Sequence, residues 1–300
     1  MSDSLARIRR QITTASDLQS VVRTMKAMAA SSIEQYEQSV RALTDYYRTI
    51  ELGLSACYRK SNMMTLSTPG NQHPESGTIC AIVFGSDQGL VGRFNDVVAY
   101  HAIQTLTKFS GSLEVWAVGE RVHARLSDAG LPMQGLFNVP NTVKAIAPLV
   151  GQIQMESVSQ QSTEEPACVY VFHNRPNSGA LYEPVSRRLL PLDTQWQKSL
   201  TKVSWPTRIV PEVMGSELSI LRALIHEYLF ISMFQACAES LASENASRLA
   251  SMQRADQNIN QLLEEFHVSF HRLRQSSIDE ELFDVVAGFD ALVASKEHLK

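Results

Sequence analysis

The sequence predicts an α/β protein in which two long antiparallel terminal helices form a coiled coil and an open-sheet domain is inserted between them. Residues 2–52 contain neither glycine nor proline, and residues 216–287 again contain neither. Most of the 14 glycines and 11 prolines lie between these two stretches. Because glycine and proline interrupt helices, both ends of the chain are predicted to be continuous helices.

Apolar residues recur in both terminal stretches mostly in alternating steps of three and four, the spacing of a coiled-coil seam. An unbroken helix of about 70 residues is on the order of 100 Å long, more than the width of a domain of this size. Helices of an ordinary globular bundle remain an alternative. The seam positions are Leu5, Ile8, Ile12, Ala15, Leu18, Val22, Met25, Ala29, Ile33, Tyr36, Val40, Leu43, Tyr47, Ile50 and Leu54, and then Leu221, Ile225, Tyr228, Phe234, Ala238, Leu241, Leu249, Met252, Ala255, Ile259, Leu262, Phe266, Phe270 and Leu273.

The middle of the chain alternates between strand-like and helix-like patterns. Such alternation predicts a small, mostly parallel, Rossmann-like open sheet with helices against it. Strand-length apolar runs lie at 78–84, 113–118 and 168–172, and helical spacing at 97–109, 120–129 and 143–157. The predicted segments are an N-terminal coiled-coil helix at 1–59, a polar linker at 60–77, an α/β domain at 78–211, here called the foot, and a C-terminal coiled-coil helix with its tip at 212–300.

An expected register follows if Leu54 and Ser216 lie level at the base of the helix pair. Asp17 would then face Arg254, and Lys26 would face Glu244. The same register places a basic cluster opposite two acidic residues, namely Arg7, Arg9 and Arg10 opposite Glu264 and Glu265.

The same register leaves the C-terminal helix without a partner helix after about Leu273. Contiguous exposed apolar surface usually marks an interaction site, so this tip is expected to be covered by another protein or to fold back on the foot. The apolar residues concerned are Ile278, Leu282, Phe283, Val285, Val286, Phe289, Leu292 and Val293.

Composition argues against several classes of protein. With 27 Lys and Arg against 31 Asp and Glu, the net charge of −4 gives no drive toward nucleic acid or an anionic membrane. No uncharged apolar stretch reaches the length of a spanning helix, and no secretory signal is recognised, so a direct membrane span is not expected. The four scattered cysteines show no zinc spacing and are expected to be reduced, buried thiols in a cytosolic protein.

A glycine-rich turn, Gly85-Ser-Asp-Gln-Gly-Leu-Val-Gly92, follows the first strand-like run. It lacks both the P-loop and the GxGxxG pattern, so nucleotide binding is disfavoured, and neither cofactor nor metal is expected. The residues expected to build a tight structural turn are Gly85, Ser86, Asp87, Gly89 and Gly92. No residue is assigned to catalysis, and His173 with Asn174 and Arg187 with Arg188 are assigned to structure or surface.

Several ordered motifs then resemble the gamma subunit of F-type ATP synthases over almost the whole chain. At the start these are Leu5-x-x-Ile8-Arg9-Arg10-x-Ile12, Gln19, and Met25-Lys26-x-x-Ala29-Ala30. In the middle, the stretch Ser86 to Asn95 resembles the family's S-D-R-G-L-C-G-G-L-N turn, and Tyr170 to Asn174 with Leu189-Leu190-Pro191 resembles its Y-N and L-L-P stretches. The most specific matches are Ala242 to Met252, Ala255, Asn258, Arg274 to Glu281, and Val285 to Leu292.

The resemblance implies the central stalk of a rotary F1 motor, a non-catalytic shaft threading three alpha and three beta subunits. It further implies an epsilon subunit and a membrane c-ring as partners of the foot, with the complex peripheral at the cytoplasmic face of the cell inner membrane. Residue by residue, it implies torque and coupling contacts at Met25, Lys26, Arg248, Gln275, Asp279 and Glu281.

The sequence departs from the family's usual residues at four positions, with Gln88 for Arg, Val91 for Cys, Leu249 for Met and Asp279 for Thr. At Asp279 a hydrogen-bond donor becomes an acceptor. The departures suggest a divergent bacterial member. Two alternatives from other classes stay open: a coiled-coil tether with an α/β ligand-binding domain, which would be a homodimer, and an α/β enzyme with helical arms, which would need a ligand at the 85–92 turn.

Overall fold

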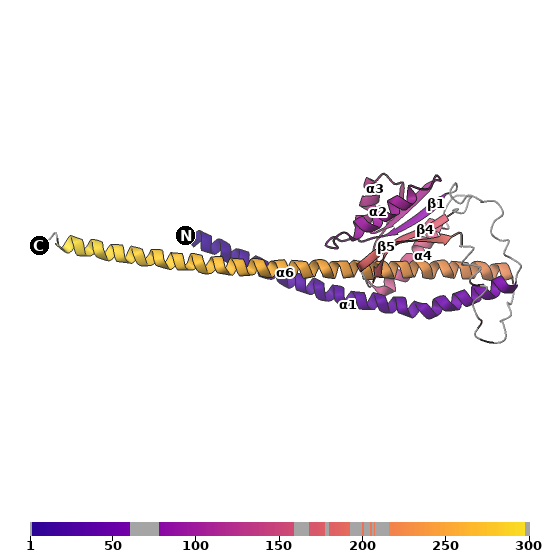
Figure 1. Ribbon diagram of the computed structural model, residues 1–300, viewed down its shortest axis with the longest axis horizontal. Coiled ribbons are helices and arrows are strands. Elements are labelled where there is room, and N and C mark those ends of the chain that lie inside the picture. The colour runs from indigo at the N-terminus through magenta and orange to yellow at the C-terminus, as the bar shows by residue number, and fades with distance from the viewer. Residues whose placement is uncertain are drawn as a thin grey trace. The chain divides into compact units, whose positions relative to one another are not determined.

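The computed structural model describes residues 2–60, 78–158, 168–177, 180–192, 200, 205, 207 and 216–297. It confirms the predicted fold class, with two long helices and a five-stranded sheet (Figure 1). Helix α1 spans Ser2–Lys60 and helix α6 spans Glu217–Glu297. The chain divides into two compact units, Met1–Met28 with Leu249–Lys300, and Ala29–Arg248, which we call the seam unit and the body unit and describe separately.

The sheet of the body unit has the strand order β3-β2-β1-β4-β5. Strands β1, β2, β3 and β4 pair in parallel and β5 is antiparallel to β4, so the expected mostly parallel sheet is present. The strands are β1 (Ile79–Phe84), β2 (Leu113–Val118), β3 (Met133–Phe137), β4 (Cys168–Asn177) and β5 (Ala180–Leu190), and the shorter helices are α2 (Phe94–Leu106), α3 (Glu120–Asp128) and α4 (Ile146–Ile153).

Strand β1 is buried at every position because both faces of the sheet are covered. Ile79, Ala81 and Val83 point into one core together with residues of α2 and α3. Cys80 and Ile82 point into the other core, which α4, α1 and α6 complete. All four cysteines are buried free thiols, as expected.

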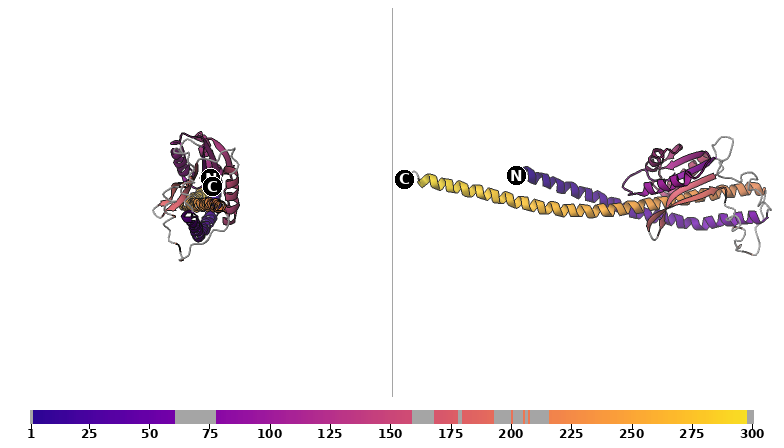
Figure 2. Two further views of the ribbon diagram at one scale, coloured as in Figure 1. Left: turned by 90° about the vertical axis from the view of Figure 1, so that its right-hand side faces the viewer. Right: turned by 45° about the horizontal axis from the view of Figure 1, so that its top comes forward.

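Within the body unit, α6 lies between the sheet and α1 (Figure 2). Leu54 and Tyr36 of α1 share one hydrophobic core with Leu241 of α6 and Val171 of β4. One 18-residue window of α6 reaches a mean hydropathy of 1.2, enough by length and composition for a membrane-crossing helix, and 44% of that window is buried inside the protein. Packing on two sides accounts for this apolar character.

In the seam unit, α1 and α6 run antiparallel, and their register corrects the expected one. Lys26 contacts Asp256 instead of Glu244, with 2.9 Å between its Nζ and the carboxylate Oδ2. Arg9 lies over the ring of Phe270, 5.6 Å from its centroid, instead of facing Glu264 and Glu265.

Asp17 was expected to face Arg254, but Arg254 donates a hydrogen bond to Ser251 on its own helix. The cause of the shift is that α1 continues to Lys60, past the expected base at Leu54. The helix passes through Gly53, where an added Cβ would lie only 3.1 Å from Leu224, so this glycine allows a close helix contact instead of ending the helix.

The end of α6 exposes a row of apolar side chains, as the sequence predicts. Phe283 is 72% exposed and Val285 70%, and Ile278, Leu282 and Val286 are exposed as well. Leu273, the expected start of the unpartnered part, is half-buried. The side chains of Phe289, Leu292 and Val293 lie outside the described residues.

The corrected register can be tested by cross-linking. Gln19 donates a side-chain hydrogen bond to Asn260, so cysteines introduced at 19 and 260 should be joined by a short bifunctional maleimide. Cysteines at 19 and 252 test the register expected from the sequence and should not be joined. Cross-linking of the 19/252 pair but not of the 19/260 pair, measured by mass spectrometry, would contradict the structure. The wild-type chain, with only buried cysteines, is the control.

Candidate functional site: the glycine-rich turn and the C-terminal helix

The turn after β1 follows a backbone path that needs glycine at its beginning. A Cβ added at Gly85 would lie 2.4 Å from Val122 of α3, so no larger residue fits there without a shift. Further along, Leu90 and Gly92 have positive φ angles of 63° and 57°. The space around Gly89 is open, so packing does not require a glycine at that position.

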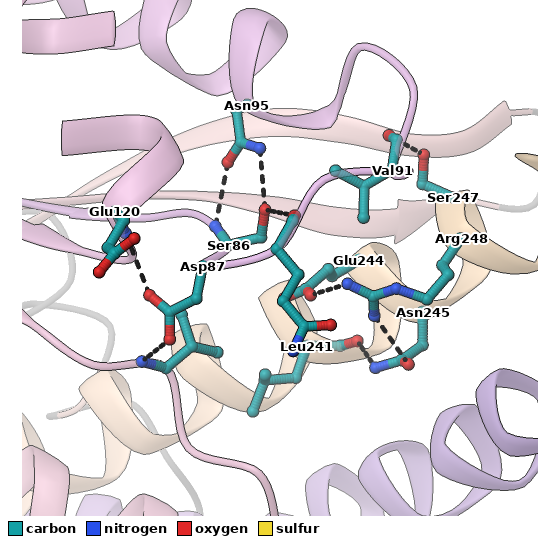
Figure 3. Close-up of polar contacts among 12 residues, drawn as sticks. Ser86, Asp87, Val91, Asn95, Glu120, Leu241, Glu244, Asn245, Ser247 and Arg248 are labelled. Atoms are coloured by element: carbon teal, nitrogen blue, oxygen red, sulfur yellow. Dashed lines mark hydrogen bonds and ion pairs between the residues drawn. The ribbon is translucent and has the colours of Figure 1, made fainter. Parts of the chain in front are cut away.

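Ser86 and Asn95 close the turn through a pair of reciprocal hydrogen bonds (Figure 3). The backbone N–H of Ser86 donates to Asn95 Oδ1 over 3.0 Å, and Asn95 Nδ2 donates to Ser86 Oγ over 2.8 Å. The Ser86 hydroxyl in turn donates to the carbonyl of Gln88. Both side chains are buried, so these bonds satisfy polar groups that water does not reach.

Asp87 joins the turn to two other segments. Its Oδ1 accepts from the backbone N–H of Glu120 over 3.0 Å, and its Oδ2 accepts from the N–H of Val139 over 2.9 Å. A carboxylate at the N-terminus of α3 stabilises the helix, because its negative charge interacts favourably with the positive end of the helix dipole. It also occupies the end of the helix where a phosphate would otherwise be favoured.

The turn and the end of β4 are fastened to α6 by two serines. Ser247 donates to the carbonyl of Val91 in the turn, and Ser243 donates to the carbonyl of Asn174 on β4 over 3.0 Å. Asn174 itself donates to the carbonyl of Phe94 at the start of α2. One buried set of polar contacts thus ties turn, strand and long helix together.

Glu244 and Arg248 form an ion pair one helical turn apart beside this junction. Arg248 Nη2 lies 2.6 Å from Glu244 Oε1, and Nη1 donates to Asn245 Oδ1 over 3.3 Å. Glu244 Oε2 is buried and has no hydrogen-bond partner among the described residues. Burial raises the pKa of Glu244, Asp87 adds to the rise, and Arg248 acts against it.

A second polar contact joins β4 to α6. His173 Nε2 lies 2.8 Å from Glu239 Oε2, and Gln235 donates to the other oxygen over 2.7 Å. Burial acts to raise the pKa of Glu239, but its contacts with His173 and Gln235 and the charge of Arg175 outweigh burial and lower it. His173 and Asn174 therefore take part in structural contacts between sheet and helix.

A cavity of about 480 Å³ lies between the turn, the start of α2 and one face of α3, from Arg121 to Asp128. Its charged lining is mixed, since Arg125 pairs with Asp96 over 2.9 Å. Within the part of the chain that the structure describes, no cluster of three His, Cys, Asp or Glu side chains could hold a metal ion.

The residues expected to make coupling contacts are not gathered in one place. In the seam unit, Met25 packs against the core of Val22, Met252 and Ile259, and Lys26 is held by Asp256. Three more of them are exposed on α6 of the same unit, namely Gln275, Asp279 and Glu281. Arg248 belongs to the body unit, where its guanidinium is bound to Glu244 and largely buried.

Sequence reasoning did not identify Asp256, Ser243 and Asn95 as contact residues. Asp256 accepts from both Lys26 and Arg23. These charges are complementary across the seam, but the sequence predicts their contact only when the correct register of the two helices is known. The contacts of Ser243 and Asn95 cannot be predicted from the residues around them in the sequence, because their partners lie in other segments of the chain.

The geometry defines a class of protein in which a small α/β domain is locked onto one of two paired terminal helices. A family model described as ATP synthase matches residues 4–292. The ATP synthase gamma chain of Actinobacillus pleuropneumoniae serotype 3 is 27% identical over 297 residues, covering 95% of this chain and 98% of that relative. The gamma chain of Brevibacillus brevis is 23% identical over 302 residues, covering 97% and 99%. The chain therefore belongs to the ATP synthase gamma family.

Solved structures agree with this fold. A chain of the Euglena gracilis mitochondrial ATP synthase, in its OSCP/F1/c-ring structure in rotational state 3, superimposes with a TM-score of 0.60 at 14% identity, covering 99% of this chain and 97% of that one. A chain from the central stalk and c-ring of the Tetrahymena thermophila mitochondrial ATP synthase gives a TM-score of 0.56 at 19% identity, covering 78% and 99%.

The raised pKa of Glu244 predicts how stability depends on pH. The Glu244 carboxyl binds its proton more tightly in the folded protein than in the unfolded chain. The folded protein therefore becomes less stable as the pH rises from the unfolded pKa toward the folded pKa. Glu244→Gln keeps the side-chain shape and removes that loss. Its free energy of unfolding relative to wild type should rise as the pH is raised above about 4.5, the ordinary pKa of a glutamate, measured by urea denaturation. A difference that does not change with pH, or that changes equally in the exposed control Glu264→Gln, would contradict the assignment.

Proposed function

We propose that this chain is the non-catalytic central rotor shaft of the F1 sector of an F-type ATP synthase, coupling ion translocation through the membrane sector to ATP synthesis or hydrolysis. Membership of the gamma family supports the role. The structural observation that carries it is the polar and apolar junction between the foot and α6, because a shaft must pass force from one part to the other without slipping.

The proposed partners are three alpha and three beta subunits around the helices, and an epsilon subunit and the membrane c-ring at the foot. The complex would sit peripherally at the cytoplasmic face of the cell inner membrane. The proposed boundaries of the foot, 78–211, enclose all five strands and α2 to α4.

The shaft performs no covalent chemistry in this mechanism. Its faces differ around the helix axis, so each rotational position presents different contacts to chemically identical beta subunits and stabilises a different state of each nucleotide site. Rotation then exchanges the energy of ion flow for nucleotide affinity. The proposed coupling contacts are those expected from the family motifs, Met25, Lys26, Arg248, Gln275, Asp279 and Glu281.

The exposed apolar end of α6 has a role of its own in this proposal. Side chains such as Phe283 and Val285 offer non-directional contacts that do not hold one rotational position. We therefore assign this end to a bearing that keeps the shaft aligned, with most of the torque carried where α1 and α6 are paired.

Co-expression with alpha and beta subunits tests the proposed assembly. The chain should co-purify as one copy with three alpha and three beta subunits, measured by native mass spectrometry. The isolated chain should not hydrolyse ATP, because it lacks a P-loop. If the chain formed a homodimer and did not bind the alpha and beta subunits, the result would contradict the shaft role. It would favour the alternative of a coiled-coil tether with an α/β ligand-binding domain.

Lys26 provides a test of coupling with a matched control. Lys26→Ala removes the ammonium group, whereas Asp256→Asn weakens the same ion pair and leaves the ammonium in place. If Lys26 acts on a beta subunit, Lys26→Ala should lower the ions pumped per ATP hydrolysed several-fold, and Asp256→Asn should leave that ratio close to wild type. Ion pumping is measured in inverted membrane vesicles. Equal, small effects of the two substitutions would contradict the coupling role. Lys26 would then only help to fix the register of α1 and α6.

A further inference from the structure

The body unit contains a cavity of about 290 Å³, separate from the glycine-rich turn and bordered by Gln235, the donor to Glu239. Its walls come from three elements, α1, α6 and β5. The lining residues are Val40, Leu43, Thr44 and Tyr47 of α1, Ile231 and Gln235 of α6, and Arg187 of β5. Its volume lies just below the range for drug-sized ligand sites, about 300–1,000 Å³. A small ligand of a few heavy atoms would fit, and a nucleotide would not.

Arg187 is fixed in the wall of this cavity by two tyrosines. Its Nη2 donates to the hydroxyl of Tyr47 over 3.1 Å and to that of Tyr228 over 3.4 Å. The guanidinium carbon also lies 5.9 Å from the centroid of the Tyr47 ring and 6.0 Å from that of Tyr228. These contacts hold the cation in a defined orientation but use only one of its three nitrogens.

The charge of Arg187 is not balanced by a carboxylate. Among the described residues, no Asp or Glu lies within ion-pair distance of this guanidinium. Burial raises the pKa of the Tyr47 phenol, so that partner is uncharged. Arg248, by contrast, has Glu244 as its counter-ion. Arg187 is half-buried and has no counter-ion, so an anion placed beside it would be attracted more strongly than in bulk water.

The carboxylate of Glu239 on α6 does not supply that anion. Its two oxygens accept from Gln235 and His173, which hold it toward β4. The Nε and Nη1 groups of Arg187 make no hydrogen bond with the described residues. They are not cut off from solvent either, since neither belongs to the buried polar atoms without a partner. Donors that are accessible, oriented and unbound match the two oxygens of a carboxylate.

We propose that this cavity binds a small carboxylate on an apolar body, with the carboxylate on Arg187 and the body against Val40, Leu43 and Ile231. The apolar part of the wall favours this ligand over inorganic anions, which have no apolar surface to pack against it and lose hydration on entry. This inference concerns a site that the shaft role does not require, so the proposed function and this site can fail independently.

Binding of benzoate to the full-length chain tests the proposal by isothermal titration calorimetry. Benzoate should bind saturably with one site per chain and at least tenfold more tightly than inorganic phosphate. Arg187→Gln should weaken benzoate binding at least tenfold. Arg188→Gln, at the neighbouring exposed position of β5, should leave it unchanged.

A second variant protects the test if Arg187→Gln does not fold. Leu43→Trp fills the cavity from α1 and leaves Arg187 in place, and it should also weaken benzoate binding at least tenfold. Absence of saturable binding, or unchanged binding in both cavity variants, would overturn the proposal. Phosphate binding as tightly as benzoate would overturn the ligand class. If benzoate bound the isolated chain but not the chain assembled with its subunits, a partner would fill the cavity and the free ligand would be wrong.

Discussion

The structure depends on the burial of one segment of α6 on two opposite sides. Between Tyr228 and Ala242 this helix packs against α1 on one side and against the sheet on the other. Small side chains make this possible, since Ala236, Ala238 and Ala242 are all buried and let the neighbouring elements approach closely. A larger residue at these positions would push either α1 or the sheet away, with a cost typical of overpacked cores, about 1–3 kcal/mol.

Polar contacts fix the position of α6 relative to the foot, which apolar packing alone does not. Apolar surfaces can slide over one another, whereas the bonds from Ser243 to Asn174, Ser247 to Val91 and His173 to Glu239 each require one relative position of α6 and the foot. In the proposed shaft this means that a rotation imposed on the foot moves this part of α6 with it. The glycine-rich turn belongs to the same junction. It stands between a strand and a helix, as a nucleotide loop does, but it lacks the nucleotide patterns and holds Asp87 where a phosphate would lie.

Sequence periodicity predicted what depends on local pattern. The two long helices, β1, β2 and the start of β4 follow from apolar spacing, because each is buried along a regular face. Apolar spacing does not predict strand β3. This strand lies at the edge of the sheet, and most of its residues alternate between half-buried and exposed positions, so it has no continuous apolar run. Strand β5 was not expected, because its alternation is broken by charged residues such as Arg187 and Arg188.

The register and the polar junction could not be obtained in the same way. A seam pattern repeats along each helix, so it is satisfied in several registers, and only the continuation of α1 through Gly53 decides between them. The turn residues Ser86 and Asp87 were found from the motif, but their partners Asn95, Glu120 and Val139 come from separate elements that folding brings together. The family resemblance, by contrast, depends on motif order alone and agrees with the family match over residues 4–292.

Single-molecule rotation measures whether the junction between the foot and α6 transmits rotation. The chain, carrying a bead on the foot, would be assembled with immobilised alpha and beta subunits and supplied with ATP. If the foot and α6 move as one body, the bead should rotate continuously in one direction with three pauses per turn, one for each beta subunit. A bead that stays still or only fluctuates while the same complexes hydrolyse ATP at a normal rate would contradict the claim that this junction transmits rotation.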